Sequence, residues 1–433
     1  MDSRPISAYL IPKLLTIKSG SQTVARLQSR IIGLLNPSDP INMQHQIKSL
    51  WHRDRVVNIL RGNYQDVTPV TVEFVPSLDC NYSCPACTYG LWKKKTIEDI
   101  GRRQMSYEVM MTLLDKIEDA DVKGVIFTGG GEPFRNPDAI RGLEYASRKN
   151  FDVGLFTNGS LLDETTVNRL ANAGISFIRV SFNSGDAANY NSFHMPENEN
   201  DFGAAKRNIR LLAHALAGKE TNFGLGVIVN KVNVDYMHTV AEFVREIFSE
   251  GVDVQLKYIA YRPVVNYGQL SSDRTKQISD DVCEKARTNF EKVKAILKDT
   301  PVIPIFAGDY FEQLRTVAPV SAITPSSCIG HSWGASIAYD GGVYLCSERD
   351  GNTDYLMGNL LRQTFGEIWT SQRRNQVITG TNECPPMCKM HRTSIILNVL
   401  TSEGSLKDCD IEEIQNFLDV IRGTGNPGGP SFI

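Results

Sequence analysis

Residues 80–87 read CNYSCPAC and place Cys80, Cys84 and Cys87 on one short loop, directly after an apolar run at Val72–Val75. Three thiolates this close together cannot complete a tetrahedral zinc site without a fourth ligand. They can instead hold three irons of a [4Fe–4S] cluster and leave the fourth iron open to a chelating cofactor. The alternative interpretations are a zinc site with a distant fourth ligand and buried thiols that bind no metal.

Six apolar, strand-like runs alternate with helix-like segments over residues 69–260. They are Val72–Val75, Gly124–Phe127, Val153–Phe156, Phe177–Val180, Leu225–Val229 and Val254–Tyr258. Strands that are buried on both faces and joined by helices form a parallel sheet, and Ser106 and Asp163 are expected to cap two of the helices. The pattern predicts an α/β fold built on a partial (β/α)6 TIM-like barrel, with its functional groups at the carboxyl ends of the strands.

Glycines and polar residues follow the predicted strands at the ends where function is expected. The second strand runs into Gly130, Gly131 and Glu132, where glycines let backbone amides approach a ligand and the carboxylate can accept from an ammonium group. The later strand ends carry Thr157, Asn158, Ser181, Asn183, Val229 and Asn230. Each group alone is typical of an ordinary turn, but together they occupy one edge of the predicted sheet.

The Cys-x3-Cys-x2-Cys spacing and the Gly-Gly-Glu-Pro run after the second strand resemble the radical S-adenosylmethionine (SAM) superfamily over residues 70–260. The resemblance implies SAM and a [4Fe–4S] cluster on Cys80, Cys84 and Cys87. Its implied SAM contacts are Gly130, Gly131 and Glu132 to the amino group, Ser181 and Asn183 to the ribose or carboxylate, Val229 or Asn230 to the adenosine, and Thr157 and Asn158 at the same rim. Ala86 departs from the family pattern, because an aromatic residue usually precedes the third cysteine. Another side chain, such as Tyr89, is therefore expected to pack against the adenine.

The implied chemistry is reductive cleavage of SAM. An electron from a flavodoxin- or ferredoxin-type donor enters the cluster, and SAM yields a 5′-deoxyadenosyl radical that removes a hydrogen atom from the substrate. The cofactors carry this chemistry, while the barrel excludes water and positions one C–H bond.

Four cysteines, at positions 328, 346, 384 and 388, stand late in the chain. The glycine pair at 341–342 predicts a tight hairpin that brings Cys328 and Cys346 together, and Cys384 and Cys388 lie on a stiff turn with two prolines. Ligand chemistry alone favours zinc here. The spacing, however, resembles the SPASM/Twitch extension of radical SAM enzymes, which implies one auxiliary [4Fe–4S] cluster, with Cys409 able to replace a ligand.

The chain is predicted to divide into a basic helical extension (1–68), the radical SAM partial barrel (69–260), a connector (261–324), an auxiliary-cluster domain (325–409) and a C-terminal helix with a Gly/Pro-rich tail (410–433). In the extension, Val24, Leu27, Ile31 and Leu34 share one helical face. We expect this face to pack on the main domain. A membrane-surface helix, a docking arm for an acidic partner and an organelle-targeting peptide are the alternatives.

Composition limits the function classes. The net charge of −3 gives no sign of nucleic-acid binding, and no apolar run approaches the roughly 20 residues of a membrane span. The nine cysteines suit ligands in a reducing compartment better than disulfides. These features predict a cytoplasmic enzyme without an integral membrane span.

Two substrate classes fit the sequence. The preferred one is a polar small molecule, such as a sugar, aminocyclitol or nucleotide sugar, which is oxidised or epimerised. The alternative is a ribosomally made peptide that is crosslinked or epimerised, although residues 1–68 show no hairpin of the kind found in peptide-binding extensions. Glu348, two residues after Cys346, is the candidate catalytic base, with general base assistance worth about 10²–10⁴-fold. Asp350 is the next candidate.

Overall fold

A computed structural model describes residues 6–35, 47–63, 67–87, 103–264, 278–308, 310–312, 329–380, 390–402 and 406–423. Its centre is a ten-stranded sheet in the order β10-β9-β8-β1-β2-β3-β4-β5-β6-β7. The strands are β1 (Thr71–Phe74), β2 (Gly124–Phe127), β3 (Asp152–Thr157), β4 (Phe177–Ser181), β5 (Asn222–Val229), β6 (Tyr258–Pro263), β7 (Ile303–Phe306), β8 (Gly334–Ile337), β9 (Gly342–Tyr344) and β10 (Leu356–Asn359). Strands β1 to β7 are parallel to their neighbours, which confirms the predicted α/β partial barrel.

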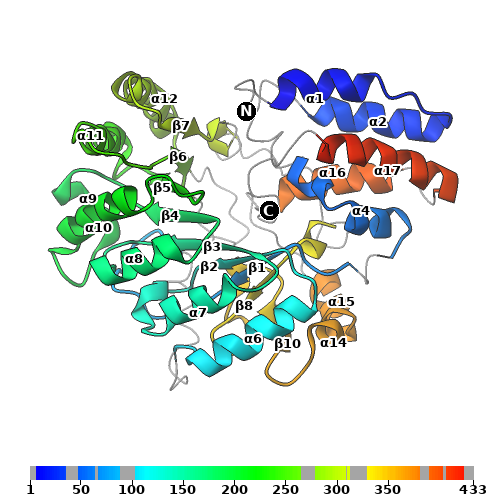
Figure 1. The fold of residues 1–433 in the computed structure, drawn as a ribbon, viewed down its shortest axis with the longest axis horizontal. Helices are drawn as coiled ribbons and strands as arrows, with labels where there is room; N and C mark the ends of the chain where they lie inside the picture. The colour runs from blue at the N-terminus through cyan, green and yellow to red at the C-terminus, as the bar shows by residue number, and fades with distance from the viewer. Residues whose placement is uncertain are drawn as a thin grey trace.

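Helices cover the outer face of the curved sheet (Figure 1). They are α6 (Tyr107–Asp119), α7 (Ala139–Ala146), α8 (Glu164–Asn172), α9 (Ala187–His194), α10 (Asp201–Ala215), α11 (Met237–Phe248) and α12 (Asp280–Leu297). The predicted caps are confirmed, since Ser106 accepts from the Val109 amide and Asp163 accepts from the Thr166 amide. These connections leave the carboxyl ends of the strands free for the site.

The far edge of the sheet differs from the sequence expectation. The sixth strand begins at Tyr258, where the run Val254–Tyr258 was expected to end. A further parallel strand, β7, follows α12 inside the predicted connector. Its central Pro304 has no amide hydrogen to donate, which weakens the strand signal in the sequence but is tolerated at a sheet edge.

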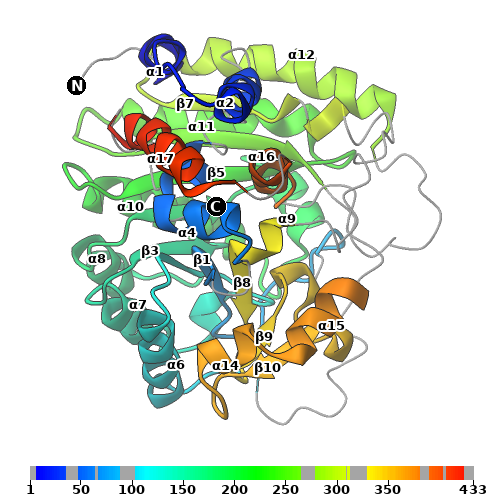
Figure 2. The same cartoon turned by 90° about the vertical axis from the view of Figure 1, so that its right-hand side faces the viewer.

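The opposite edge joins the barrel to the C-terminal part of the chain. Strand β8 pairs parallel with β1, and β8 and β9 form the expected antiparallel hairpin, with Gly341 at φ +80° in its turn. Strand β10 completes the edge, and α14 (Phe365–Trp369) and α15 (Gln372–Gly380) lie beside it (Figure 2). The indole of Trp369 donates to the Val67 carbonyl at 2.6 Å, which fixes α14 to the segment leading into β1.

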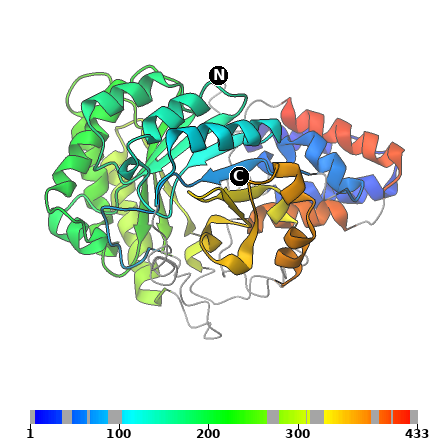
Figure 3. The same cartoon turned by 90° about the horizontal axis from the view of Figure 1, so that it is seen from below.

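Both ends of the chain form one helical unit. It contains α1 (Ile6–Leu15), α2 (Gln22–Leu34), α4 (Arg53–Leu60), α16 (His391–Thr401) and α17 (Asp408–Arg422). These helices lie together in Figures 1 and 3 and share a second hydrophobic core with the fully buried Trp333. Because Val24, Leu27 and Ile31 of α2 are buried in this core, the apolar face of the extension packs inside the chain and is not available to a membrane surface.

None of the helices in the described ranges is both long enough and apolar enough to cross a membrane.

Candidate active site

The cysteine loop and the turn after β2 lie in direct backbone contact. The Gly131 amide donates to the Ser77 carbonyl at 3.1 Å, and the Glu132 amide donates to the Asp79 carbonyl at 2.8 Å. A Cβ atom at Gly131 would come within 2.1 Å of the Asp79 oxygen. Glycine is therefore required at 131, because only a residue without a side chain permits this approach.

Glu132 is a buried carboxylate that ties the second strand end to the third. Its Oε1 accepts from the Thr157 hydroxyl at 2.6 Å, and its Oε2 accepts from the Asn158 amide at 2.7 Å. Burial, partly offset by these hydrogen bonds, raises the pKa of Glu132 to about 7. A buried carboxylate of this kind would be stabilised as the anion by an ammonium group beside it.

The polar side chains near the cysteine loop form a connected network. The Asn158 side-chain amide donates to Asn81 Oδ1 at 2.9 Å, and Asn81 in turn donates to Ser160 Oγ and to Asp201 Oδ2, each at 2.8 Å. Asn81 follows Cys80 directly in the sequence. The network therefore fixes the start of the cysteine loop against the end of β3 and the start of α10.

His194 at the end of α9 was not identified from the sequence. Its Nδ1 lies 3.4 Å from the Cys84 sulfur, and its Nε2 lies 3.3 Å from Asn183 Nδ2. The Asn183 Oδ1 accepts from the Ile228 amide at 2.6 Å, so the amide's NH2 group faces the imidazole. Nε2 is then the acceptor, and the proton of the neutral ring lies on Nδ1, which donates to Cys84.

The remaining expected SAM contacts lie at the carboxyl ends of β4 and β5. Ser181 ends β4 half-buried, and Val229 ends β5 fully buried. Asn230 follows, with its Oδ1 accepting from the Val232 amide at 2.8 Å. The structure thus brings all of these residues to one edge of the sheet, and their roles toward SAM stay predictions.

The late cysteines are only partly covered by the described residues. Cys346 is half-buried and lies at the end of the β8–β9 hairpin. Cys328, Cys384 and Cys388 lie outside the described residues, as do Tyr89 and the side chain of Glu348. Asp350, two residues beyond, is buried and accepts from the Ser336 hydroxyl of β8 at 2.8 Å.

The cysteine loop fits an iron–sulfur cluster by its donor set. Cys80, Cys84 and Cys87 are half-buried thiols on one loop, and His194 already donates to one of them. Three cysteine ligands are what a cluster with one open iron requires. In the described part of the chain, no three His, Cys, Asp or Glu side chains already converge on a metal position.

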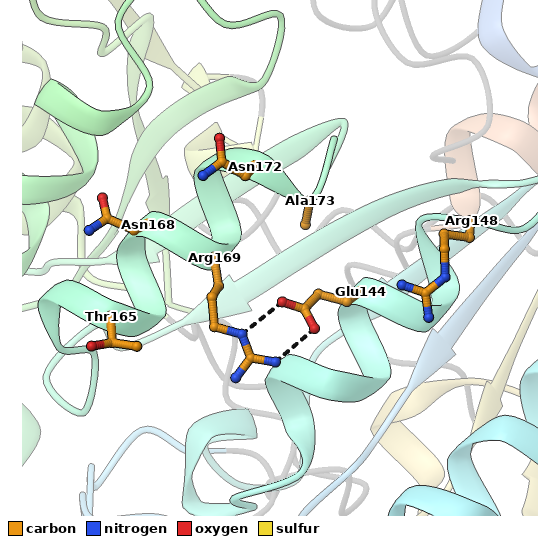
Figure 4. A pocket seen from close by; sticks show the side chains of 7 residues that line it. All are labelled: Glu144, Arg148, Thr165, Asn168, Arg169, Asn172 and Ala173. Carbon is orange, nitrogen blue, oxygen red and sulfur yellow. Dashed lines mark hydrogen bonds and ion pairs between the residues drawn. The ribbon is translucent and has the colours of Figure 1, made fainter.

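A hollow on the outer helical layer lies apart from this site. It is lined by α7 and α8, where Arg169 forms a two-pronged ion pair with Glu144 at 2.7 Å for each bond (Figure 4). Because it opens on the helical side of the sheet, it does not line the carboxyl ends of the strands.

Comparison with known proteins gives two family matches. Residues 74–244 match the radical SAM superfamily, and residues 328–391 match the iron–sulfur cluster-binding domain called SPASM. Both the fold and these matches define an enzyme that uses SAM and iron–sulfur clusters.

The chain belongs to the radical SAM superfamily and carries a C-terminal SPASM domain. Its cofactors are SAM, a [4Fe–4S] cluster and auxiliary iron–sulfur clusters in the SPASM domain.

The sequence identity to named relatives is low, but the similarity extends over most of the chain. The chain is 24% identical over 314 residues to the PqqA peptide cyclase of Gluconobacter oxydans (strain 621H), covering 72% of this chain and 79% of the relative. It is 24% identical over 385 residues to the Fe-coproporphyrin III synthase of Methanosarcina barkeri (strain Fusaro / DSM 804), covering 83% and 86%. The fold resembles Streptococcus suis SuiB bound to S-adenosylmethionine, with a TM-score of 0.53 and 15% identity over 72% of this chain and 67% of that one.

Proposed function

We propose that Cys80, Cys84 and Cys87 hold the radical SAM cluster and that the enzyme removes a hydrogen atom from a ribosomally made peptide, leading to a crosslink or an epimerised residue. When bound, the cluster and SAM supply a 5′-deoxyadenosyl radical. Everything else falls to the protein, which must bind SAM and the peptide and keep water away from the radical.

In this proposal Glu132 accepts the SAM ammonium group. The carboxylate is buried at the turn after β2, where the Gly131 backbone lies against the cysteine loop. Burial raises the pKa of this carboxyl group and so favours its protonated form, whereas a cationic partner would favour the ionised form. Thr157 and Asn158 orient the carboxylate by donating to its two oxygens.

The choice of a peptide over a sugar-like molecule rests on the apolar rim of the site. Leu161, Met195, Val232 and Tyr236 are exposed by 36–52%, and they lie in segments that follow β3, β4 and β5. Met195 adjoins the cysteine loop, since its carbonyl accepts from the Ser83 amide at 3.1 Å. Exposed apolar side chains beside a site suit a peptide's side chains better than the hydroxyl groups of a sugar.

One of the named relatives favours the same choice. A PqqA peptide cyclase is among the proteins of similar sequence, and the similarity covers 72% of this chain. The small-molecule substrate favoured by sequence alone has less support, because it depended on a missing hairpin in residues 1–68 and on no feature of the barrel rim.

The roles of the C-terminal residues remain proposals. Cys328, Cys346, Cys384 and Cys388 would hold an auxiliary cluster that accepts an electron from the substrate radical. Glu348 would accept the proton released with that electron, and Asp350, which is buried beside β8, is the other carboxylate close in sequence.

A substrate panel tests the proposal. Reconstituted enzyme, SAM and a reductant would be incubated separately with peptides encoded beside the gene and with nucleotide sugars and aminocyclitols, and 5′-deoxyadenosine would be quantified. We expect at least a tenfold stimulation by one peptide, with loss of two hydrogens for a crosslink or uptake of deuterium from D₂O for an epimer. Stimulation by a sugar or aminocyclitol alone would contradict the peptide proposal.

A further inference from the structure

Two arginines lie on the inner face of the curved sheet. In β4 and β6 the fully buried residues alternate with half-buried ones, and Ile178, Val180 and Ile259 are the buried members that pack in the main core. Arg179 and Arg262 occupy the half-buried positions. Successive strand residues point to opposite faces, so both arginines lie on the face turned away from the helices.

The protein makes room for the Arg179 side chain on this face. Its guanidinium carbon lies 3.7 Å from the centre of the Phe156 ring on β3. On the other side, the neighbouring strand β5 has Gly226, where a Cβ atom would approach Arg179 Cδ to 3.3 Å. A flat guanidinium on an aromatic ring keeps its N–H groups directed sideways and available to a ligand.

The strand register places the second arginine and a tyrosine nearby. Arg179 pairs with Gly224 of β5, and Gly224 pairs with Tyr258 of β6. Arg262 lies on the same face of β6 as Tyr258, four residues or two repeats of the pleat further toward the carboxyl end of the strand. Burial, and to a lesser extent the positive charge of Arg262, lowers the pKa of Arg179 to about 9. Burial raises the pKa of the Tyr258 hydroxyl, and the two arginines partly offset this shift.

No described carboxylate forms an ion pair with either guanidinium. Among the described residues, the side chains of Arg179 and Arg262 also form no hydrogen bond. Glu73 of β1 also lies within electrostatic range of Arg179, where it has a weaker influence than Arg262. Two half-buried cations of like charge are costly unless an anion joins them.

We propose that Arg179 and Arg262 form an anion subsite on the inner face of the barrel, which binds a carboxylate of the substrate. A carboxylate matches the planar fork of a guanidinium and accepts two hydrogen bonds from it. The choice of carboxylate rests on the proposed function, because the anionic groups of an unmodified peptide are the side chains of Asp and Glu and the C-terminus. The Phe156 and Tyr258 rings would contact the methylene groups that lead to it.

A pair of matched probes tests the subsite without requiring turnover. Binding of N-acetyl-glutamate α-amide and of its neutral glutamine counterpart would be measured by calorimetry on reconstituted wild-type protein. We expect the glutamate probe to bind at least tenfold more tightly. This preference should disappear in Arg179→Met, be partly kept in Arg179→Lys, and be unchanged in Lys257→Met, which removes an exposed cation next to the start of β6.

Three results would overturn the subsite. Equal binding of the two probes, or a preference that survives in Arg179→Met, would remove the arginines from anion binding. Tighter binding of inorganic phosphate than of the glutamate probe would assign a phosphate instead of a carboxylate. Loss of the preference once SAM is added would assign the arginines to the carboxylate of SAM itself.

Failure of the peptide proposal is a separate outcome. The probes report binding only, so the subsite would still pass this test if the substrate were a carboxylate-bearing small molecule. Conversely, a peptide could stimulate SAM cleavage while the two probes bind equally, which would reject the subsite alone.

Discussion

At the scale of single residues, the site depends on a carboxylate whose charge is opposed by its surroundings. Glu132 is only 3% exposed, and burial raises its pKa to about 7. An ordinary glutamate has a pKa of about 4.3, so the folded protein without SAM holds the proton more tightly than the unfolded chain. The resulting stabilisation is complete below pH about 4 and is lost as the pH rises through about 7.

Glu132 therefore predicts how SAM binding depends on pH. The ionised carboxylate pairs with the SAM ammonium group, so the dissociation constant for SAM should fall as the pH rises from about 5.5 to about 7.5. Calorimetry on reconstituted protein measures this trend. The Glu132→Gln variant should bind SAM weakly with no such trend, and an unchanged trend in that variant would show that another group titrates.

His194 predicts a change in the reduction potential of the cluster. Hydrogen bonds to cluster sulfurs are among the factors that set this potential, and His194 Nδ1 donates to Cys84. His194→Leu should make the midpoint potential more negative, where a tenfold change in the reduction equilibrium is 59 mV for one electron. His194→Asn, which keeps a hydrogen-bond donor near the position of Nδ1, should have a midpoint potential close to that of the wild type.

Redox titration followed by electron paramagnetic resonance makes the His194 measurement. The signal that changes on SAM addition identifies the radical SAM cluster and separates it from the auxiliary one. Equal potentials in His194→Leu and the wild type would mean that the histidine has only a packing role.

At the scale of elements, the cysteine loop and the turn after β2 behave as one unit. Gly131→Ala places a methyl group against the Asp79 carbonyl, 2.1 Å away before any relaxation, and should cost about 1–3 kcal/mol. Gly203→Ala in α10 meets nothing within 4 Å and should stabilise by about 0.5–1 kcal/mol. Thermal unfolding measures both, and equal effects would mean that the loop moves aside freely.

Local signals in the sequence were sufficient for many elements. Ser106 and Asp163 cap their helices as expected, since a cap depends only on residues three positions apart. The β8–β9 hairpin follows from its glycine pair. Strand β7 was missed because Pro304 interrupts a short run, and the sixth strand was placed too early because Val254 and Leu256 continue the apolar pattern ahead of Tyr258.

Contacts between distant segments could not be predicted in the same way. His194 reaches Cys84 only because α9 packs its C-terminal end against the cysteine loop, 110 positions away in the chain. The Arg179 position is likewise defined by its neighbours on β3 and β5. A single sequence gives the polar residues at each strand end but not which of them meet.

At the scale of the whole molecule, the two chain ends stabilise each other. Phe417 of α17 is fully buried in the core shared with α2 and Trp333. Phe417→Ala should lower the free energy of unfolding by about 3–5 kcal/mol. Urea unfolding followed by tryptophan fluorescence measures this loss, with the exposed Glu412→Ala as a control that should change little. Equal stabilities would mean that α17 contributes nothing to the unit.

The central claim is that the loop at residues 80–87 holds the cluster that cleaves SAM. The most direct measurement is 5′-deoxyadenosine formation by anaerobically reconstituted protein with SAM and a reductant. Wild-type protein should form 5′-deoxyadenosine, whereas the triple variant Cys80→Ala/Cys84→Ala/Cys87→Ala should form none while it stays folded and keeps about four irons in the SPASM domain. Reductive cleavage of SAM that persists in the triple variant would contradict the account.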